Sequence, residues 1–362
     1  MNLPVLSSSG CERAILCLLF VLISLPAFQY CLAAEIDSVT PRKIRLENSI
    51  DELNRIINQR LEKGIQNANE QQDVVADIYV DDFDEFEDVD EDSFCDEESL
   101  YRELRKAVFD SFTASWGLKG YDLDEQLRGL LASKSYTLLL NDSIYRDIDY
   151  LEGFSLNIKQ LSDVVNIDGH LVGLDKLGHF FAQGWQYFEL THDDEATLFD
   201  AMQWGRQYEA GMFGYTTTGI FSYADLVANL NGWRFWNKVL LKQDDPLKGV
   251  LANFFNKPYV TCKIQIIDSI KQRKVIRAWQ RNSRFDLSDY IDGAWDEGNN
   301  CNSYADPIIE EKVTSRIKSI DPEFVCPLNA ELCVEARDRY GELAKYVLHP
   351  ACLTAGDRPR FY

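Results

Sequence analysis

Polar side chains that can do acid–base chemistry interrupt an apolar stretch near the middle of the chain. They lie in two runs, LDKLGHFF and FSYADLVAN, with one glutamate between the runs. Buried charges are costly unless they pair with a partner, so charged residues in an apolar setting indicate a defined polar site. The candidate site residues are Asp175, Lys176, His179, Glu209, Asp225 and Asn229.

The spacing within each run places the polar side chains on one helical face. Asp175 and His179 are four residues apart, so their side chains can meet on a helix. A carboxylate beside an imidazole orients it and raises its pKa, which suits a general base, a metal ligand or a buried hydrogen bond between helices. Asp225 and Asn229 repeat this spacing, and Gly232 on nearly the same face lets another helix approach closely. We therefore expect Asp175, His179, Glu209, Asp225 and Asn229 to converge.

These residues support two hypotheses of function. In the first, which we favour, they form a buried polar network that fixes helix packing in a non-catalytic assembly or scaffold protein. In the second, they form the site of a hydrolase or transferase, with His179 as the acid–base group and Asp175 orienting it. Glu209 and Asp225 would then bind a divalent cation or the substrate. The residues assigned to binding are Lys176, Asp225 and Asn229.

Helical periodicity surrounds the candidate site. Apolar residues at spacings of three and four predict helices over residues 171–190, 195–209 and 223–241. Ser222 is a typical N-cap residue for the third of these helices. Further helices are predicted over residues 45–69, 97–112, 123–131, 246–255, 306–320 and 329–347. Short strands or hairpins are predicted over residues 135–140, 145–150, 164–167, 259–267 and 275–279.

The N-terminal residues have the pattern of a secretory signal. An apolar run over residues 14–25 lies between Arg13 and Pro26, and the small residues Ala33 and Ala34 follow it. This order predicts a signal peptide over residues 1–34 and an exported protein; a retained membrane anchor is the alternative. Beyond residue 34 there is no apolar run of about eighteen residues, so no further membrane span is predicted.

The charge of the chain is unevenly distributed. The formal net charge is -22, and residues 77–99 alone hold thirteen Asp or Glu and no Lys or Arg. Self-repulsion predicts a disordered acidic linker there, between an N-terminal segment (35–76) and a helical core (100–258). The amphipathic helix over 45–69 either docks on the surface or forms a coiled coil with a second copy or a partner protein. The remaining sequence shows no basic groove, so nucleic acid is not an expected partner.

The cysteines also indicate export. Three of the nine lie in the predicted signal peptide, and five of the other six lie in the C-terminal region, residues 259–362. An even number in an exported chain predicts disulfides, with fifteen possible pairings. Cys95 stands apart in the acidic segment. The other disulfide candidates are Cys262, Cys301, Cys326, Cys333 and Cys352. The fold class we expect is mainly α with small β elements, a helical core and a disulfide-stapled C-terminal region.

Alternatives remain open for the cysteines and for one polar loop. We favour a Cys262–Cys301 pair among the possible disulfides. A zinc site from the residues around Cys326, Cys333, His349 and Cys352 is the alternative. The run over residues 292–303 is rich in oxygen ligands that calcium could use, but it lacks the spacing of an EF-hand loop. We favour a polar turn pinned by a disulfide.

The combined pattern resembles a known family. Its order, Asp-Lys-x-x-His-Phe, then Glu, then Asp-x-x-x-Asn-x-x-Gly, is similar to VanZ-like proteins and to YfiM-like bacterial lipoproteins, over residues 171–232. The resemblance implies a bacterial envelope protein, periplasmic or envelope-associated, that meets an envelope lipid or a cell-wall component; it implies no defined reaction. The chain lacks the transmembrane helices of VanZ proteins and has Tyr208 where the YfiM-like group often has Lys. The matching positions are Asp175, Lys176, His179, Phe180, Glu209, Phe221, Ser222, Asp225, Leu226, Asn229 and Gly232.

Overall fold

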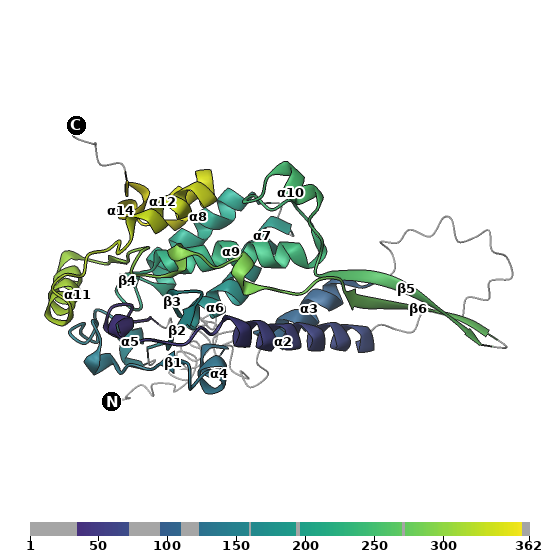
Figure 1. Cartoon of the computed structure of the whole chain (residues 1–362), viewed down its shortest axis with the longest axis horizontal. Helices are drawn as coiled ribbons and strands as arrows, with labels where there is room; N and C mark the ends of the chain where they lie inside the picture. Colours follow the sequence, from purple (N-terminus) through teal and green to yellow (C-terminus); the bar gives the residue numbers. More distant parts are fainter. Residues whose placement is uncertain are drawn as a thin grey trace, which may run out of the picture. The chain divides into compact units, whose positions relative to one another are not determined.

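The fold is mainly α-helical, as the sequence predicts, with three small antiparallel sheets (Figure 1). The predicted signal peptide (1–34) and most of the predicted acidic linker (77–99) lie outside the residues that the structure describes. Among the described residues, no helix combines the length and the apolar character needed to cross a membrane. The computed structural model describes residues 35–71, 95–109, 123–158, 161–192, 196–269 and 272–356.

The helices occur in groups along the chain. The longer ones are α2 (Ile50–Gln71), α3 (Glu97–Val108), α8 (Leu198–Tyr208), α9 (Tyr223–Leu240), α11 (Pro307–Ile320) and α12 (Ala330–Tyr340). The shorter ones are α4 (Leu123–Leu130), α5 (Phe154–Ile158), α6 (Asp175–Gly178), α7 (Gly184–His192), α10 (Val250–Phe254), α13 (Ala344–Val347) and α14 (Pro350–Leu353). Two π-helical turns are η5 (His179–Gln183) and η6 (Glu209–Phe213). The 3-10 turns are η1 (Thr40–Lys43), η4 (Leu140–Asp142), η7 (Leu287–Asp289), η8 (Gly293–Trp295) and η9 (Gly341–Leu343).

The strands pair in short antiparallel ladders. One sheet has the order β1 (Ser135–Tyr136), β2 (Val164–Ile167) and β3 (His170–Gly173). Asp168 and Gly169 join β2 to β3 with φ angles of 50° and 90°, the left-handed conformation that a two-residue hairpin loop requires. The other two sheets pair β4 (Ile220–Phe221) with β7 (Ser303–Tyr304), and β5 (Val260–Ser269) with β6 (Gln272–Arg281).

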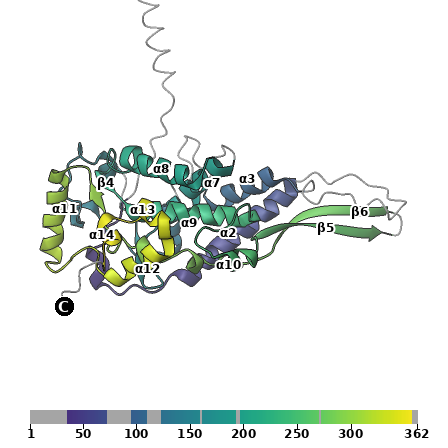
Figure 2. The same ribbon diagram turned by 90° about the horizontal axis from the view of Figure 1, so that it is seen from above.

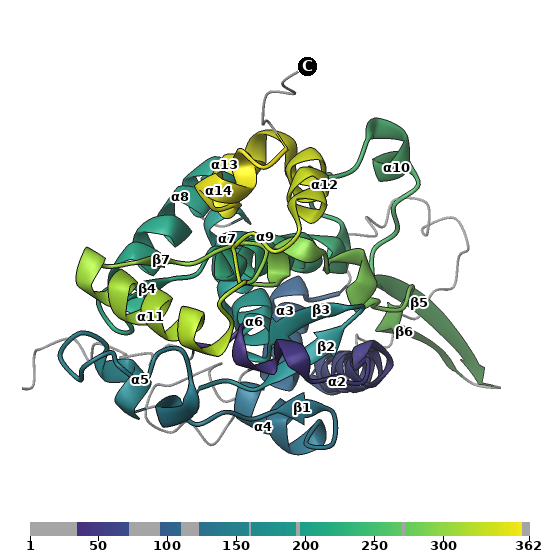
Figure 3. The same cartoon turned by 60° about the vertical axis from the view of Figure 1, so that its left-hand side comes forward.

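Helix α9 is the element around which the core is built. All of its residues except Lys238 and Leu240 are buried, so it has no solvent-facing side. Figures 1 and 3 show α9 between the C-terminal helices α12 to α14 on one side and α6 with β2 and β3 on the other. Helix α9 crosses α7 where Gly184 and Gly232 face each other; a Cβ atom on Gly232 would lie 1.8 Å from the carbonyl oxygen of Phe180. Two glycines therefore set the distance between these helices.

The amphipathic helix α2 packs within the chain. Its apolar residues Leu53, Ile57, Leu61 and Ile65 are buried in the main core. Helix α3 lies against it, at a point where a Cβ atom on Gly64 would lie 2.9 Å from the Cα atom of Leu104. Figure 2 shows α2 and α3 side by side, with β5 and β6 running out beyond their ends. Of the two arrangements predicted for this helix, the one in which it docks on the rest of the chain is therefore observed.

Two predicted elements differ from the structure in kind, and others differ in extent. The strand predicted over 135–140 covers only residues 135–136, and the helix predicted over 246–255 covers only residues 250–254. The helix predicted over 171–190 begins only at Asp175, because residues 170–173 pair with β2 as strand β3. The hairpin predicted over 145–150 is wrong: this stretch forms turns. Tyr145 and Ile148 are both buried against α11, which a turn allows and strand alternation does not.

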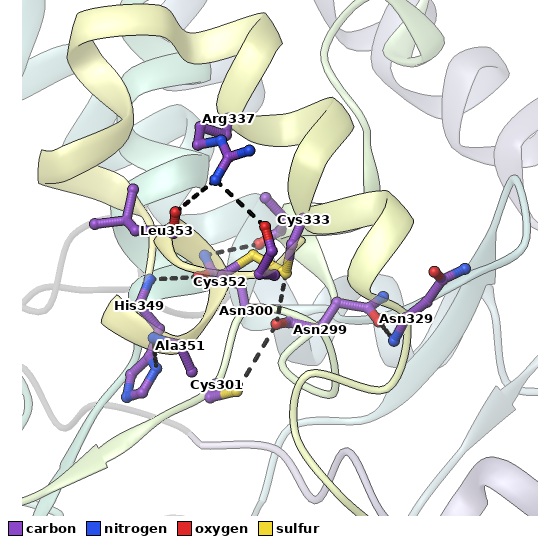
Figure 4. Close-up of a disulfide and its surroundings, with 12 residues drawn as sticks. Asn299, Asn300, Cys301, Asn329, Cys333, Arg337, His349, Ala351, Cys352 and Leu353 are labelled. Atoms are coloured by element: carbon purple, nitrogen blue, oxygen red, sulfur yellow. Dashed lines mark hydrogen bonds between the residues drawn. A yellow bond between two sulfur atoms is a disulfide. The ribbon is translucent and has the colours of Figure 1, made fainter. Parts of the chain in front are cut away.

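The disulfides confirm the stapled C-terminal region but not the favoured pairing. The bonds are Cys95–Cys262, Cys301–Cys326 and Cys333–Cys352, so the predicted Cys262–Cys301 pair is wrong. The zinc alternative is also wrong, because its cysteines are oxidised and the His349 Nδ1 atom accepts the Ala351 N–H at the start of α14. Figure 4 shows the third bond tying α12 to α14, beside Asn299 and Arg337.

The polar run 292–303 is a turn pinned by the Cys301–Cys326 disulfide, as favoured, and hydrogen bonds within the chain hold it as well. Asp292 caps η8, and Asp296 accepts the guanidinium of Arg42 and the Gly298 N–H. The side-chain Oδ1 atom of Asn300 accepts the His349 N–H at 2.9 Å (Figure 4), and the side-chain Nδ2 atom of Asn300 donates to backbone carbonyls. Donors within the chain therefore occupy the side-chain oxygens of Asp292, Asp296 and Asn300 that calcium could otherwise bind.

The glycine crossing gives a first prediction. Gly232→Ala should lower the free energy of unfolding by about 3 kcal/mol or more, because its Cβ atom would meet main chain that cannot move aside. Gly129→Ala in α4 is the matched control, since open space surrounds its Cβ position. That change should be neutral or stabilise by about 0.5–1 kcal/mol through helix propensity. Urea unfolding measures both; equal effects would contradict the close crossing.

Candidate functional site

A fully buried lysine lies at the centre of the candidate site. Lys176 has no exposed surface, and its Nζ atom lies 2.8 Å from Asp175 Oδ2, 2.5 Å from Asp225 Oδ1 and 2.7 Å from Glu297 Oε1. These carboxylates come from α6, from α9 and from the loop after η8. One ammonium group therefore connects three separate parts of the chain. We call the following set the Lys176 cluster: Glu35, Asp175, Lys176, His179, Glu209, Ser222, Asp225 and Glu297.

His179 joins the cluster through α9. Its Nε2 atom lies 3.1 Å from Asp225 Oδ2, and its Nδ1 atom lies 2.6 Å from Gln183 Oε1. The sequence predicted Asp175 as the residue that orients His179, but Asp225 and Gln183 hold the two ring nitrogens. Asp175 directs its Oδ2 atom to Lys176 instead. Asp225 is thus the carboxylate shared between the lysine and the histidine.

Both π-helical turns carry predicted site residues. His179 begins η5 and Glu209 begins η6. A π-helical turn is uncommon, and it is found most often where a helix must reposition a functional side chain. Glu209 Oε1 accepts the backbone N–H of Ser222 at 3.1 Å. This bond ties the end of α8 to the start of α9, next to Asp225.

The start of α9 is built to hold acidic groups. Ser222 is its N-cap, and the Ser222 Oγ atom accepts the Asp225 N–H. The same Oγ atom lies 3.1 Å from Asp225 Oδ1 and 3.1 Å from Glu297 Oε1. A carboxylate in the first turn of a helix is stabilised by the helix dipole. The N-terminus of α9 therefore places the carboxylates of Asp225 and Glu297 around the hydroxyl of Ser222.

The structure adds two carboxylates that the sequence did not assign to the site. Glu35 is buried, and its Oε1 atom accepts the Thr218 hydroxyl at 2.7 Å. Glu297 is buried as well, and its Oε2 atom accepts the Asn302 amide at 2.8 Å. Glu297 lies in the polar run 292–303, which was the only signal for it. Glu35 follows the predicted signal peptide with no motif of its own.

Asn229 lies one turn beyond Asp225, near the hydroxyl of Tyr187 on α7. Within the described residues, its buried Oδ1 atom has no hydrogen-bond partner. Of the five residues predicted to converge, Asp175, His179 and Asp225 therefore lie in one group. Glu209 reaches the group through the Ser222 N–H, and Asn229 continues it along α9.

The cluster contains more acidic groups than basic ones. Burial raises the pKa of Glu35, Glu209 and Glu297, and neighbouring carboxylates such as Asp225 raise these values further. Burial works against the charged form of Lys176, but Asp175, Asp225 and Glu297 outweigh it, so its pKa is raised well above the usual value. Lys176 is therefore the internal cation of the site, and the glutamates retain protons to higher pH than exposed ones.

Three of the residues could also hold a metal ion. Asp175, His179 and Asp225 can each offer one ligand atom, and these atoms lie within 4.8 Å of one another. Two carboxylates and one imidazole suit Zn²⁺ or Mn²⁺. The ammonium of Lys176 already lies 2.5 Å from Asp225 Oδ1, so a dication would have to displace it or bind on the His179 side.

One cavity touches the cluster at its edge. It has a volume of about 290 Å³ and lies beside α11 and the Cys301–Cys326 bond, with Tyr145 and His349 in its lining. Glu297 lines this cavity, whereas Asp175, His179, Glu209 and Asp225 do not. A ligand in the cavity would meet the cluster at Glu297.

Comparisons of the chain with protein-family models, with curated proteins and with solved structures find no match.

The central lysine gives the second prediction. Lys176→Met should lower the free energy of unfolding by about 3–5 kcal/mol, because it leaves buried carboxylates without their counter-charge. Lys312→Met is the matched control: Lys312 also bridges two carboxylates, Asp149 and Glu152, but at the surface. Its loss should cost about 1 kcal/mol or less. Denaturant titration at neutral pH measures both, and a small effect at Lys176 would contradict its role.

Glu209 gives a prediction about pH. Its pKa is raised in the folded protein, so the folded state holds the proton more tightly than the unfolded state does. The resulting stabilisation is complete below the unfolded-state pKa, near 4.5, and is lost as the pH rises through the folded-state value. Glu209→Gln keeps an acceptor oxygen for the Ser222 N–H and cannot ionise. Its melting temperature relative to the wild type should therefore rise between about pH 5 and pH 8.

The exposed residue Glu311 supplies the control for this experiment. The melting temperature of Glu311→Gln should differ from that of the wild type by a nearly constant amount over the same pH range. If Glu209→Gln behaves like Glu311→Gln, the proton is not held at Glu209.

Proposed function

We propose that this chain is an exported protein of the bacterial cell envelope with a non-catalytic assembly or scaffold role. In this proposal the Lys176 cluster holds the helices in one arrangement and does no chemistry. The observation that carries it is the buried ammonium of Lys176, which lies within 2.8 Å of three carboxylates from distant parts of the chain. Such a group is strongly destabilising when one partner is lost, so it favours one packing over others.

Burial of the candidate catalytic groups supports the non-catalytic role. Asp175, His179, Glu209 and Asp225 are each 7% exposed or less. A general acid or base must come within hydrogen-bond reach of the substrate. Glu297 is the member of the cluster that lines the described cavity, and it is already bonded to Lys176 and Asn302.

The disulfides support export. Three disulfide bonds join all six cysteines of the described residues, a usage typical of proteins that mature outside the reducing cytosol. The signal-peptide pattern of residues 1–34 points the same way. The resemblance to VanZ-like and YfiM-like proteins adds the bacterial envelope, and we propose that relation on the residues that form the cluster.

A partner of the scaffold would meet the polar side of α2. The apolar side chains of segment 45–69 pack against other parts of the same chain, while Arg55, Gln59 and Lys63 are exposed. A second copy or a partner protein that docks on this segment would therefore bind through polar contacts. Such contacts give specificity more than affinity.

A catalytic role is the second candidate. The grouping of Asp175, His179 and Asp225 favours it, because these residues could hold a divalent cation. The protein would then be a hydrolase or transferase that acts on a cell-wall or lipid precursor. His179 would be the acid–base group, with Glu209 and Asp225 on the cation or substrate.

His179→Ala separates the two roles. The scaffold proposal expects a loss of about 2–3 kcal/mol in unfolding free energy, because Asp225 and Gln183 each lose a buried hydrogen-bond partner. Activity in the cell should then fall only as far as the amount of folded protein falls. Unfolding measurements and quantification of the folded protein in cells provide the two readings.

The opposite result would favour the catalytic role. A His179→Ala protein that folds to the wild-type level and has no cellular function would overturn the scaffold proposal. So would a rise in the melting temperature of the wild type with Zn²⁺ or Mn²⁺ that is absent in His179→Ala.

A further inference from the structure

A group of large apolar side chains on α10 faces solvent. Val250 is 86% exposed, Leu251 77%, Phe254 79% and Phe255 73%. The rings of Phe254 and Phe255 contact each other edge to face, with centroids 5.1 Å apart. Contiguous exposed apolar groups of this kind mark interaction sites on folded proteins. We call these four residues the α10 apolar cluster.

The loop that carries this cluster is braced from inside. Arg234 on α9 forms two 2.8 Å hydrogen bonds with Asp245, and both side chains are buried. The Asn253 amide donates to the backbone carbonyls of Asp245 and Lys248, and its carbonyl oxygen accepts the Asp245 N–H. The polar side of α10 is therefore fixed to the body, which leaves its apolar side chains exposed. Figures 1 and 3 show α10 at the periphery of the ribbon.

Basic residues flank the α10 apolar cluster along the sequence, and the nearby Asp245 is paired with Arg234. Lys248 precedes it and Lys257 follows it, and Lys257 is exposed. The hairpin of β5 and β6 comes next, and residues 257–284 contain eight Lys or Arg and one Asp. The whole chain, by contrast, has a formal charge of -22. A basic segment next to exposed apolar side chains is complementary to a surface that is both anionic and apolar.

We propose that α10 and the adjoining hairpin bind an anionic lipid surface. Phe254, Phe255 and Leu251 would enter the boundary between headgroups and acyl chains, where aromatic side chains are favoured. Lys248 and Lys257 would lie at the level of the lipid phosphates. The Cys95–Cys262 bond joins the segment before α3 to strand β5, so the base of the hairpin is fixed to the helices. This inference does not depend on the role of the Lys176 cluster.

Vesicle sedimentation tests the lipid surface. The full chain, expressed with export, should sediment with vesicles of phosphatidylglycerol and phosphatidylcholine and more weakly with phosphatidylcholine alone. The double variant Phe254→Ser with Phe255→Ser should lower the partition coefficient at least about tenfold, because two apolar side chains no longer leave water. Lys248→Gln with Lys257→Gln should lower it about tenfold or more on anionic vesicles and little on neutral ones.

The control is Leu151→Ser, which removes a 95% exposed apolar side chain at a different place on the protein. It should bind vesicles as the wild type does. All variants share the same N-terminal residues, so any contribution of residues 1–34 to vesicle binding is the same in each. Unchanged melting temperatures would show that the variants are folded. The proposal is overturned if the wild-type protein does not bind anionic vesicles. It is also overturned if Phe254→Ser with Phe255→Ser binds them as well as the wild type does.

Two other outcomes would assign the surface differently. If the α10 apolar cluster binds a second copy of the chain, sedimentation equilibrium would show a dimer for the wild type and a monomer for Phe254→Ser with Phe255→Ser. Binding of an oligonucleotide in place of vesicles would show that the basic hairpin reads phosphates without a membrane. Either result, without vesicle binding, rejects the lipid surface.

Discussion

The buried ammonium of Lys176 is the interaction on which the core depends. Removing a charge from water costs several kcal/mol, and only close counter-charges and hydrogen bonds offset that cost. Asp175, Asp225 and Glu297 supply them from positions far apart in the sequence. The lysine is therefore satisfied only when α6, α9 and the loop after η8 have all reached their native positions. A group that tolerates one arrangement and penalises others contributes more to specificity than to net stability.

The helices that carry the cluster are shaped to close around it. The facing glycines Gly184 and Gly232 let α7 and α9 approach to main-chain contact, which no larger residue would allow. The π-helical turns begin at His179 and Glu209, two residues of the site, and such turns are frequent at functional sites. Close approach brings the polar groups within hydrogen-bond distance, and it also excludes the water that would otherwise solvate them. The same packing that creates the cluster thus raises the pKa of its glutamates.

Local sequence patterns predicted the parts of the site that lie on helices. Spacing of four, set within apolar sequence, identified Asp175, His179 and Asp225, because helical periodicity depends only on near neighbours. Glu297 and Glu35 could not be found in this way, since their place beside Lys176 depends on how distant segments fold together. The Cys262–Cys301 error has the same origin: six cysteines allow fifteen pairings, and only the folded chain brings Cys95, just before α3, to Cys262 in β5.

The Lys176 cluster and α10 both reverse the usual placement of polar and apolar groups, and the two are not equivalent. Inside, the ammonium of Lys176 offsets the charge of the carboxylates around it, and burial favours the protonated form of the cluster's glutamates. On α10, the exposed phenylalanines contact each other and remain mostly in water, while the polar side of the same loop is held by Arg234 and Asn253. Fixing the loop with its apolar side outward keeps a hydration cost that burial would remove. This hydration cost is explained if α10 is a binding surface. It is not explained if the Lys176 cluster in the interior is the protein's only functional feature.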